Sequence, residues 1–275
     1  MRKFYKRGCK FRALLASVLV AMLAPINPAF GAELALVIDD LGYHKARGMR
    51  AIELPGAVTV AVLPFAPHTS SLVEHAAQHR KDVIVHQPME PHPASRVRNE
   101  HGTLMLGMAD FEFAATLTAA LDAVPTRVGV SNHTGSLLTQ HRVPMLRVMR
   151  EIDQRGLFFL DSRTTAETVA LDVALEQGIP ALKRDVFLDH EPTADAIHAA
   201  FEASLHMARR KGHAVVIGHP YAITLEYLER RLAALPADVR LVRAAELAHR
   251  RARISHPGVL AQPPDLRSLH ISPGR

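Results

Sequence analysis

The sequence predicts a single-domain α/β fold in which parallel strands are joined by crossover helices. Two observations support this. Short runs rich in Val, Ile and Leu alternate about eight times with amphipathic segments, and several of those segments stop at Gly or Pro. Such an alternation is typical of parallel sheets, and it is compatible with either a (β/α) barrel or an open doubly wound sheet.

The individual elements follow the same periodicity along the chain. The expected strands are 34–38, 58–63, 82–86, 127–132, 157–161, 181–188, 214–218 and 239–242. The expected helices are 71–79, 110–124, 144–155, 193–211 and 225–234. A long irregular segment, 88–108, follows the third strand and is predicted to lie over a site.

Residues 1–31 are predicted to be a secretory signal peptide. A basic stretch, MRKFYKRGCKFR, precedes the apolar run ALLASVLVAMLA, which is followed by a polar segment with small residues suited to cleavage. The apolar run is about a dozen residues long, whereas a bilayer span needs ~20. We expect cleavage and a soluble periplasmic protein with no membrane span, with an uncleaved anchor as the alternative.

The rest of the chain divides into a domain, 32–249, and a basic, Pro-containing tail, 250–275. The six Lys and Arg residues of the leader account for the whole formal charge of +6, so the charge gives no reason to expect nucleic acid binding. The only cysteine, Cys9, lies in the leader. A core and a metal, rather than a disulfide, are therefore expected to hold the domain together.

Ionisable side chains follow six of the predicted strands directly. They belong to Asp39-Asp40, His86 to Glu90, Asn132-His133, Asp161 to Arg163, Asp189-His190 and His219. Because the carboxyl ends of parallel strands meet at one face, these groups are expected to gather there. Other histidines in helical or turn contexts are treated as background: His44, His68, His75, His79, His141, His198, His206 and His213.

Adjacent Asp39 and Asp40 predict a metal site beside a general base. Side chains alternate along a strand, so the two carboxylates are expected to point in different directions. One of them, together with two imidazoles, suits Zn²⁺ or a similar first-row ion. The other would then lie next to water at the open position of the metal. Either aspartate alone would also be an ordinary helix cap, and Asp189 is expected to cap the helix after Pro192.

Six motifs in order carry a resemblance to a known family. They are IDDLG, HQPMEP, GVSNHTGS, FFLDSRT, DVFLDH and IGHPYAITLEYL, spread over residues 34–247. The sequence resembles the divergent, YibQ-like branch of the NodB-like polysaccharide deacetylase superfamily (carbohydrate esterase family 4). The resemblance implies a distorted (β/α) barrel.

The resemblance also implies residue roles. Asp39 would be the base, Asp40 and His133 metal ligands, and His219 the general acid. The superfamily usually has a second His where this chain has Leu137. His86 is proposed as the replacement ligand. An Arg-Pro-Pro-Tyr-Gly motif is also missing from the sequence.

For the residues that would support the catalytic and metal-binding groups, more than one role remains open. Asp161 and Arg163 are expected either to form a structural ion pair or to rebuild the support of the missing motif. Asp161 or Asp185 would orient His219, and Ser136 is counted as a further supporting residue. The metal is expected to be Zn²⁺, with Co²⁺, Ni²⁺ and Mn²⁺ as alternatives.

Three functions remain at this stage. The first is an exported, metal-dependent deacetylase acting on N-acetylated envelope polysaccharide. The second is a non-catalytic module that binds glycan or an envelope protein, which Leu137 and the missing motif favour. The third is a serine hydrolase using Ser131 or Ser136, although His133 stands where a nucleophile elbow needs its last glycine.

Overall fold

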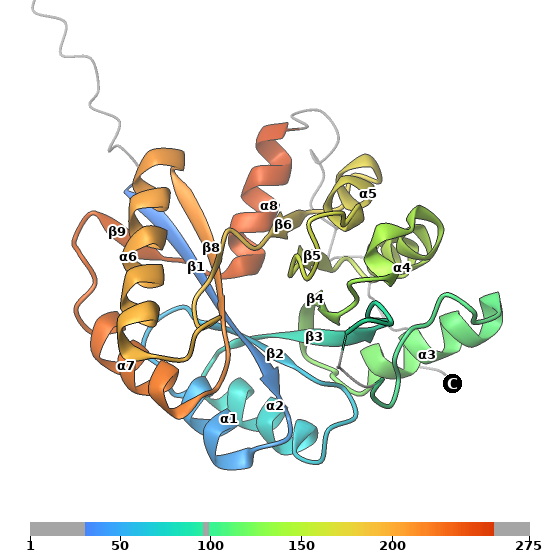
Figure 1. Cartoon of the computed structure of the whole chain (residues 1–275), viewed down its shortest axis with the longest axis horizontal. Helices are drawn as coiled ribbons and strands as arrows, with labels where there is room; N and C mark the ends of the chain where they lie inside the picture. The colour runs from blue at the N-terminus through green and yellow to red at the C-terminus, as the bar shows by residue number, and fades with distance from the viewer. Residues whose placement is uncertain (1–30, 96–98, 256–275) are drawn as a thin grey trace, which may run out of the picture. The chain divides into compact units, whose positions relative to one another are not determined.

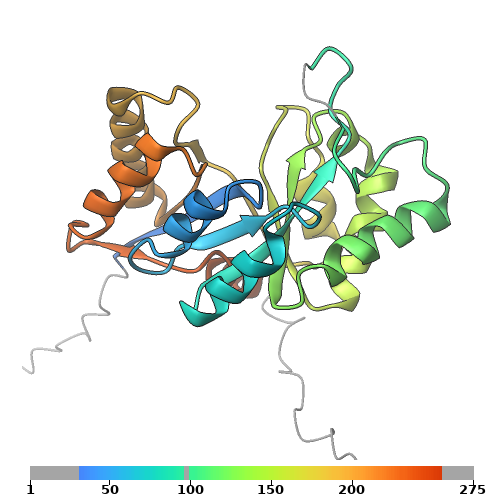
Figure 2. The same cartoon turned by 90° about the horizontal axis from the view of Figure 1, so that it is seen from below.

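The chain forms a curled parallel sheet with helices around it (Figures 1 and 2). The computed structural model describes residues 31–95 and 99–255, so residues 1–30 of the predicted leader lie outside the described residues. The strands are β1 (Ala32–Leu41), β2 (Thr59–Val62), β3 (Asp82–Met89), β4 (Arg127–Thr134), β5 (Phe158–Asp161), β6 (Ala181–Lys183), β7 (Val186–Phe187), β8 (His213–Gly218) and β9 (Val239–Leu241). The helices are α1 (Lys45–Ile52), α2 (Thr69–Gln78), α3 (Asp110–Asp122), η1 (Leu138–Gln140), α4 (Arg142–Gln154), α5 (Ala170–Glu176), α6 (Ala194–Lys211), α7 (Ala222–Leu232) and α8 (Ala244–Ser255).

The sheet curls until its two edges are bridged by the chain itself. Its strands run in the order β6-β5-β4-β3-β2-β1-β8-β7, with β9 beside the start of β1. Only two residues separate β6 from β7, yet these strands are the opposite edges. The N–H of Arg184 donates to Asp161 O on one edge and the N–H of Asp185 donates to Val215 O on the other.

The expected distorted (β/α) barrel is therefore confirmed, and the open doubly wound alternative is wrong. The expectation of one strand over 181–188 is also wrong, because the curl of the sheet splits that run into β6 and β7. The five predicted helices correspond to α2, α3, α4, α6 and α7, whereas α1, α5 and α8 were not expected. No helix among the described residues combines the length and apolarity needed to cross a membrane.

Alternation along the strands separates two apolar layers. In β1, Leu34 and Leu36 belong to the large cluster beneath the outer helices, whereas Ala35 and Val37 belong to a smaller inner cluster. Helix α8 adds Ala244, Leu247 and Ala248 to this inner cluster. The amino ends of the strands are thus filled and covered by apolar side chains.

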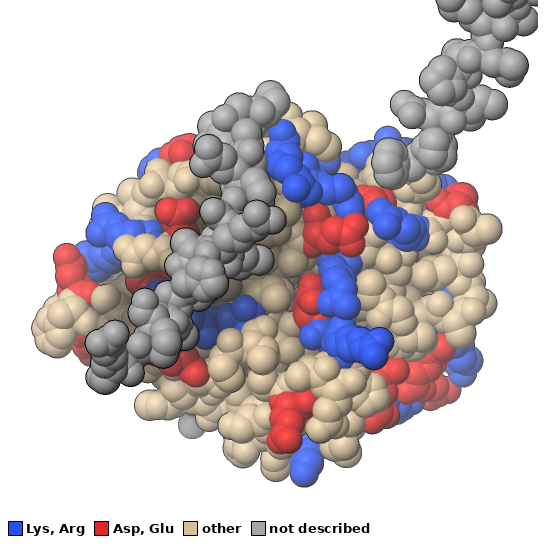
Figure 3. All heavy atoms as spheres, turned by 180° about the vertical axis from the view of Figure 1, so that it is seen from behind, with Lys and Arg blue, Asp and Glu red and all other residues tan. Residues whose placement is uncertain are grey.

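Ion pairs surround this amino end. Glu33, at the start of β1, meets Arg240 and Arg250 at 2.5 and 2.6 Å, and Asp82, at the start of β3, meets Arg243. Figure 3 shows basic and acidic side chains interspersed over the face that it presents. Because α8 runs to Ser255, the predicted boundary at 249/250 falls inside this helix. The rest of the predicted tail lies beyond the described residues.

Candidate active site

A β-bulge turns both carboxylates of the Asp39-Asp40 pair toward one pocket. Ile38 pairs with Val60 and Leu41 with Val62, so β1 carries one extra residue opposite β2. Asp40 has φ of 60°, a backbone conformation that few non-glycine residues adopt. The expectation that the two side chains diverge is wrong, because the extra residue breaks the alternation at that point.

His86 and His133 reach the same point from β3 and β4. Oδ1 of Asp40 lies 2.9 Å from Nδ1 of His133 and 3.2 Å from Nε2 of His86. One potential ligand atom from each residue lies within 4.8 Å of the other two. Among the described residues, this buried Oδ1 accepts no hydrogen bond of normal geometry. A carboxylate oxygen facing two imidazole nitrogens without hydrogen bonding fits the donor set of a divalent metal.

Neighbouring side chains hold the two imidazoles in place. The Nδ1 atom of His86 lies 2.7 Å from the Ser131 hydroxyl, which orients the ring so that Nε2 faces the aspartates. Ser131 is fully buried, so this contact favours a supporting role over that of a nucleophile. The Nε2 atom of His133 lies 3.5 Å from Glu100, whose other oxygen accepts from the Tyr43 hydroxyl at 3.2 Å. Sequence reasoning missed Glu100 because it stands in an irregular loop.

The two adjacent aspartates differ in electrostatic environment. Burial raises the pKa of Asp39, and the nearby His86 offsets this only in part. Burial also opposes ionisation of Asp40, but the facing His133 and His86 outweigh it and hold the pKa of that carboxyl well below its usual range. Burial would lower the pKa of His133, yet Asp40 and Glu100 raise it to about 10. Asp39 is therefore the more basic carboxylate of the pair.

His219 approaches from β8, with Asp189 behind it. Its Nδ1 lies 2.9 Å from Asp189 Oδ1, and its Nε2 lies 3.8 Å from Asp40 Oδ2. The second oxygen of Asp189 accepts from the His219 backbone N–H at 2.7 Å and from the Thr224 hydroxyl at 2.9 Å. Burial would lower the pKa of His219, but Asp189 and the two nearby aspartates raise it.

The expectation that Asp161 or Asp185 orients His219 is therefore wrong. Asp161 accepts from the Arg163 backbone N–H and from the Thr168 hydroxyl, and burial raises its pKa. Asp185, the residue just before β7, accepts from the N–H of Val215 in β8. Asp189 does not cap the next helix either, since Thr193 accepts from the Ala196 N–H there.

Loops after β3, β4 and β5 brace the rim of the pocket. Asn132 donates to Thr134 O at 2.9 Å and accepts from the Ser162 N–H at 2.8 Å, which ties two loops together. Thr134 and Arg163 have φ of 54° and 50°, so strained backbone recurs at this end of the barrel. Ser136 accepts from the His92 N–H and so supports the loop after β3.

The pocket between these groups has a volume of about 680 Å³. Its lining includes both aspartates, His86, His133, His219, Asn132, Arg163, Arg184 and Phe187. Leu137 is not part of that lining, whereas His86 is, and His86 belongs to the candidate donor set with Asp40 and His133. The pocket is large enough to take up a sugar-sized ligand.

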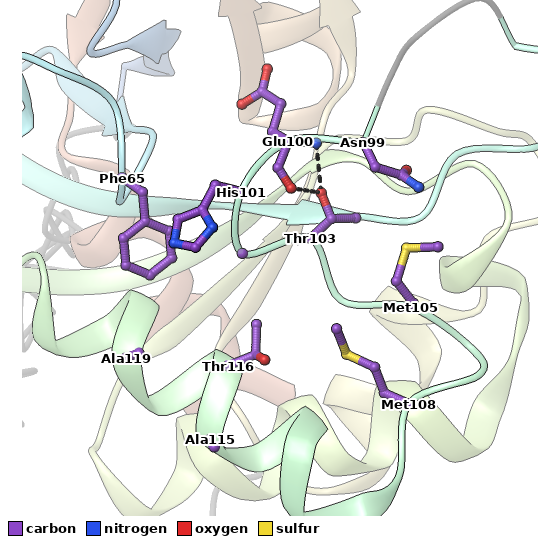
Figure 4. A pocket seen from close by; sticks show the side chains of 11 residues that line it. Phe65, Asn99, Glu100, His101, Thr103, Met105, Met108, Ala115, Thr116 and Ala119 are labelled. Carbon is purple, nitrogen blue, oxygen red and sulfur yellow. Dashed lines mark hydrogen bonds between the residues drawn. The ribbon is translucent and has the colours of Figure 1, made fainter.

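A second pocket, of about 590 Å³, lies between the loop after β3 and helix α3 (Figure 4). Met105, Met108 and Phe65 contribute apolar walls, and Glu100 belongs to its lining. Figure 4 shows Thr103 bonded to the backbone of Glu100, with the Glu100 carboxylate pointing away from the two methionines. The loop predicted to lie over a site thus lines this pocket and brings Glu100 to His133.

Comparison with known proteins identifies the family of this chain. Residues 36–248 match the divergent polysaccharide deacetylase family. The chain belongs to that family. Similar proteins include the uncharacterized protein YibQ of Escherichia coli K12, 36% identical over 82% of this chain and 70% of its own length. An uncharacterized protein of Haemophilus influenzae is 37% identical over 76% of this chain and 74% of its own length.

A solved structure supports the fold independently. An uncharacterized protein from Agrobacterium tumefaciens C58 superposes with a TM-score of 0.75 at 23% identity, covering 81% of this chain and 92% of its own. At that identity the likeness concerns the fold alone.

Proposed function

We propose that the protein is a metal-dependent deacetylase that removes acetyl groups from N-acetylated envelope polysaccharide. One observation carries the proposal. A buried carboxylate, Asp39, lies beside the Asp40, His86 and His133 donor set, with Nε2 of His86 3.5 Å from Asp39 Oδ2. On the other side, His219 faces the same pocket with its own carboxylate partner. A base, a metal donor set and an acid around one pocket suit amide hydrolysis.

Asp40, His86 and His133 would hold the metal. Two imidazoles and one carboxylate suit Zn²⁺ best, with Co²⁺, Ni²⁺ or Mn²⁺ as alternatives. Such an ion supplies Lewis acidity, which polarises the acetamide carbonyl and makes water easier to deprotonate.

The side chains of this chain would move the protons. Asp39 accepts a proton from the water that attacks the acetamide carbon. When the carbon–nitrogen bond breaks, His219 donates a proton to the departing amine, leaving acetate and a free amino sugar. Asp189 holds His219 through Nδ1, so that Nε2 is the atom directed toward the pocket.

Acetate release tests this function. The metal-loaded protein is incubated with N-acetylated chitooligosaccharides and with peptidoglycan, and free acetate and new amines are quantified. Turnover in equal amounts of both products is the expected result. Stoichiometric glycan binding without acetate would instead support the non-catalytic module, which the missing superfamily His at Leu137 favours.

We also propose that the protein acts in the periplasm, because its predicted leader has the three parts of a secretory signal. Cell fractionation followed by sequencing of the N-terminus of the purified protein tests this. Recovery from the periplasmic fraction with a new N-terminus near residue 32 is expected, and recovery of the intact chain from the cytoplasm would contradict it.

A further inference from the structure

A second cluster of potential metal ligands lies at the C-terminal ends of α1 and α2. His75 and His79 stand one turn apart at the end of α2, and Glu53 is the residue that ends α1. Both helices begin next to the strand ends that carry the pocket, so this cluster lies at their opposite ends. The candidate active site uses none of these three residues.

The three side chains already face one another. Nε2 of His75 lies 2.9 Å from Oε1 of Glu53, and the rings of His75 and His79 are 4.4 Å apart between centroids. One potential ligand atom from each lies within 4.8 Å of the other two. Spacing of four residues puts two imidazoles on one face of a helix, which is an arrangement suited to binding one ion.

Packing fixes the two helix ends before any ion binds. A Cβ at Gly48 would lie 2.6 Å from Leu72 Cδ1, so glycine at this position lets α1 approach α2 closely. The Lys81 ammonium donates to the carbonyls of Leu54 and Gly56, each at 2.6 Å. The segment that carries Glu53 is thereby tied to the segment that follows His79. Such preorganisation lowers the entropic cost of binding.

Charges of both signs lie near the end of α2, because the cationic Arg80 and Lys81 follow His79 directly in the chain. The C-terminal end of a helix carries partial negative charge on its free carbonyl groups. The exposed Glu53 carboxylate adds a full negative charge, and His79 is exposed, whereas the His75 side chain is only 16% exposed. An ion from solution therefore reaches Glu53 and His79 directly, and the His75 ring lies behind them.

We propose that Glu53, His75 and His79 form a second metal site that binds a first-row divalent transition ion such as Zn²⁺. Imidazole nitrogens favour Zn²⁺, Cu²⁺ and Ni²⁺ over Mg²⁺, which prefers oxygen ligands. The ion would join α1 to α2 at the side of the domain opposite the pocket.

Calorimetric titration with Zn²⁺ tests the proposal, using protein stripped of metal and checked for residual metal before use. Asp40→Ala, which removes one ligand of the candidate active site, is expected to keep one Zn²⁺ per chain. Combining it with His79→Gln should weaken this remaining binding by at least about tenfold. Mg²⁺ should give no binding at this cluster.

His206→Gln is the matched control, because His206 is an exposed histidine on helix α6 outside the cluster. In the Asp40→Ala background, this change should leave Zn²⁺ affinity unaltered. Two results would overturn the proposal. One is that His79→Gln, added to Asp40→Ala, leaves the Zn²⁺ affinity unaltered, and the other is that Asp40→Ala alone abolishes Zn²⁺ binding while the circular dichroism spectrum stays native. In the otherwise unchanged protein, His79→Gln should weaken the binding of one ion by the same factor whether or not the pocket binds metal, so the second site is tested independently of the proposed function.

Discussion

The two ends of the barrel are built from the same strands but differ in how fully their carboxylates are paired. At the amino end, α8 fills the interior with apolar side chains, and both carboxylate oxygens of Glu33 meet arginines. At the carboxyl end, Oδ1 of Asp39 and Oδ1 of Asp40 are buried without a hydrogen-bond partner among the described residues. Strained backbone at Asp40, Thr134 and Arg163 lies at this end as well.

This difference indicates that the amino end of the barrel mainly stabilises the fold, whereas the carboxyl end mainly serves binding or chemistry. Apolar burial and paired charges hold the domain together, whereas buried unpaired carboxylates cost stability and persist where they are needed for binding or chemistry. Substitutions at the carboxyl end should therefore change activity more than stability, and substitutions at the amino end the reverse.

Asp39→Asn should have the largest effect on activity. Loss of the proposed base is expected to lower kcat by about 10³-fold, or about 4 kcal/mol, because an amide cannot accept the proton from water. Metal content should stay unchanged, since Asp39 is not one of the three proposed ligands, and the unfolding midpoint should not fall, since the variant removes a buried carboxylate with an unpaired oxygen. Steady-state acetate release and elemental analysis of the same sample measure both. Retained turnover would refute the role of Asp39.

Leu247→Ala, at the amino end, should lower stability and leave activity unchanged. Leu247 is 2% exposed and packs in the inner cluster, so its truncation is expected to lower the free energy of unfolding by roughly 2–5 kcal/mol. Urea denaturation measures the loss, and kcat per folded molecule should not change. A fall in kcat with unaltered stability would break the proposed separation of the two ends.

Asp189→Asn should act on catalysis through His219. The amide no longer provides the charge that stabilises a protonated imidazole, so kcat is expected to fall about 10²-fold while KM changes little. Asp161→Asn is the matched control, because Asp161 is also a buried carboxylate, at the end of β5, but contacts Arg163 and Thr168. Equal losses of kcat in the two variants would contradict the assignment of Asp189.

Glu100→Gln should have the smallest effect. Glu100 faces His133 rather than the proposed metal position directly, and loss of its charge is expected to weaken metal affinity at the pocket by about tenfold. Competition with a chromophoric chelator measures that affinity. An unchanged affinity would show that Glu100 does not support His133.

The resemblance to a known family predicted the barrel and the roles of Asp40 and His133, whereas the alternation of strands and helices alone left a barrel or an open sheet. His86 was expected to join them because it ends a neighbouring strand. Alternation along β5 could also have excluded Asp161 as a residue that orients His219. Phe158 and Leu160 face the inner layer, so the next residue of β5 faces outward. Asp189 stood within a quoted motif but was interpreted as a helix cap, since its link to His219 depends on the pairing of β7 with β8.

Other features could not be predicted from local pattern. The bulge at Asp40 depends on how β1 pairs with β2, and the division of 181–188 into two strands depends on the curl of the whole sheet. Glu100 lies in an irregular loop, where no periodicity indicates the direction of a side chain.

Metal analysis tests most directly whether the strand ends hold an ion. Protein carrying His79→Gln, which removes the proposed surface site, is purified without chelators and analysed for transition metals. One ion per chain is expected in this variant, and none when Asp40→Ala is added. Absence of metal from the His79→Gln protein, combined with no Zn²⁺ uptake in titration, would contradict a metal site at Asp40, His86 and His133.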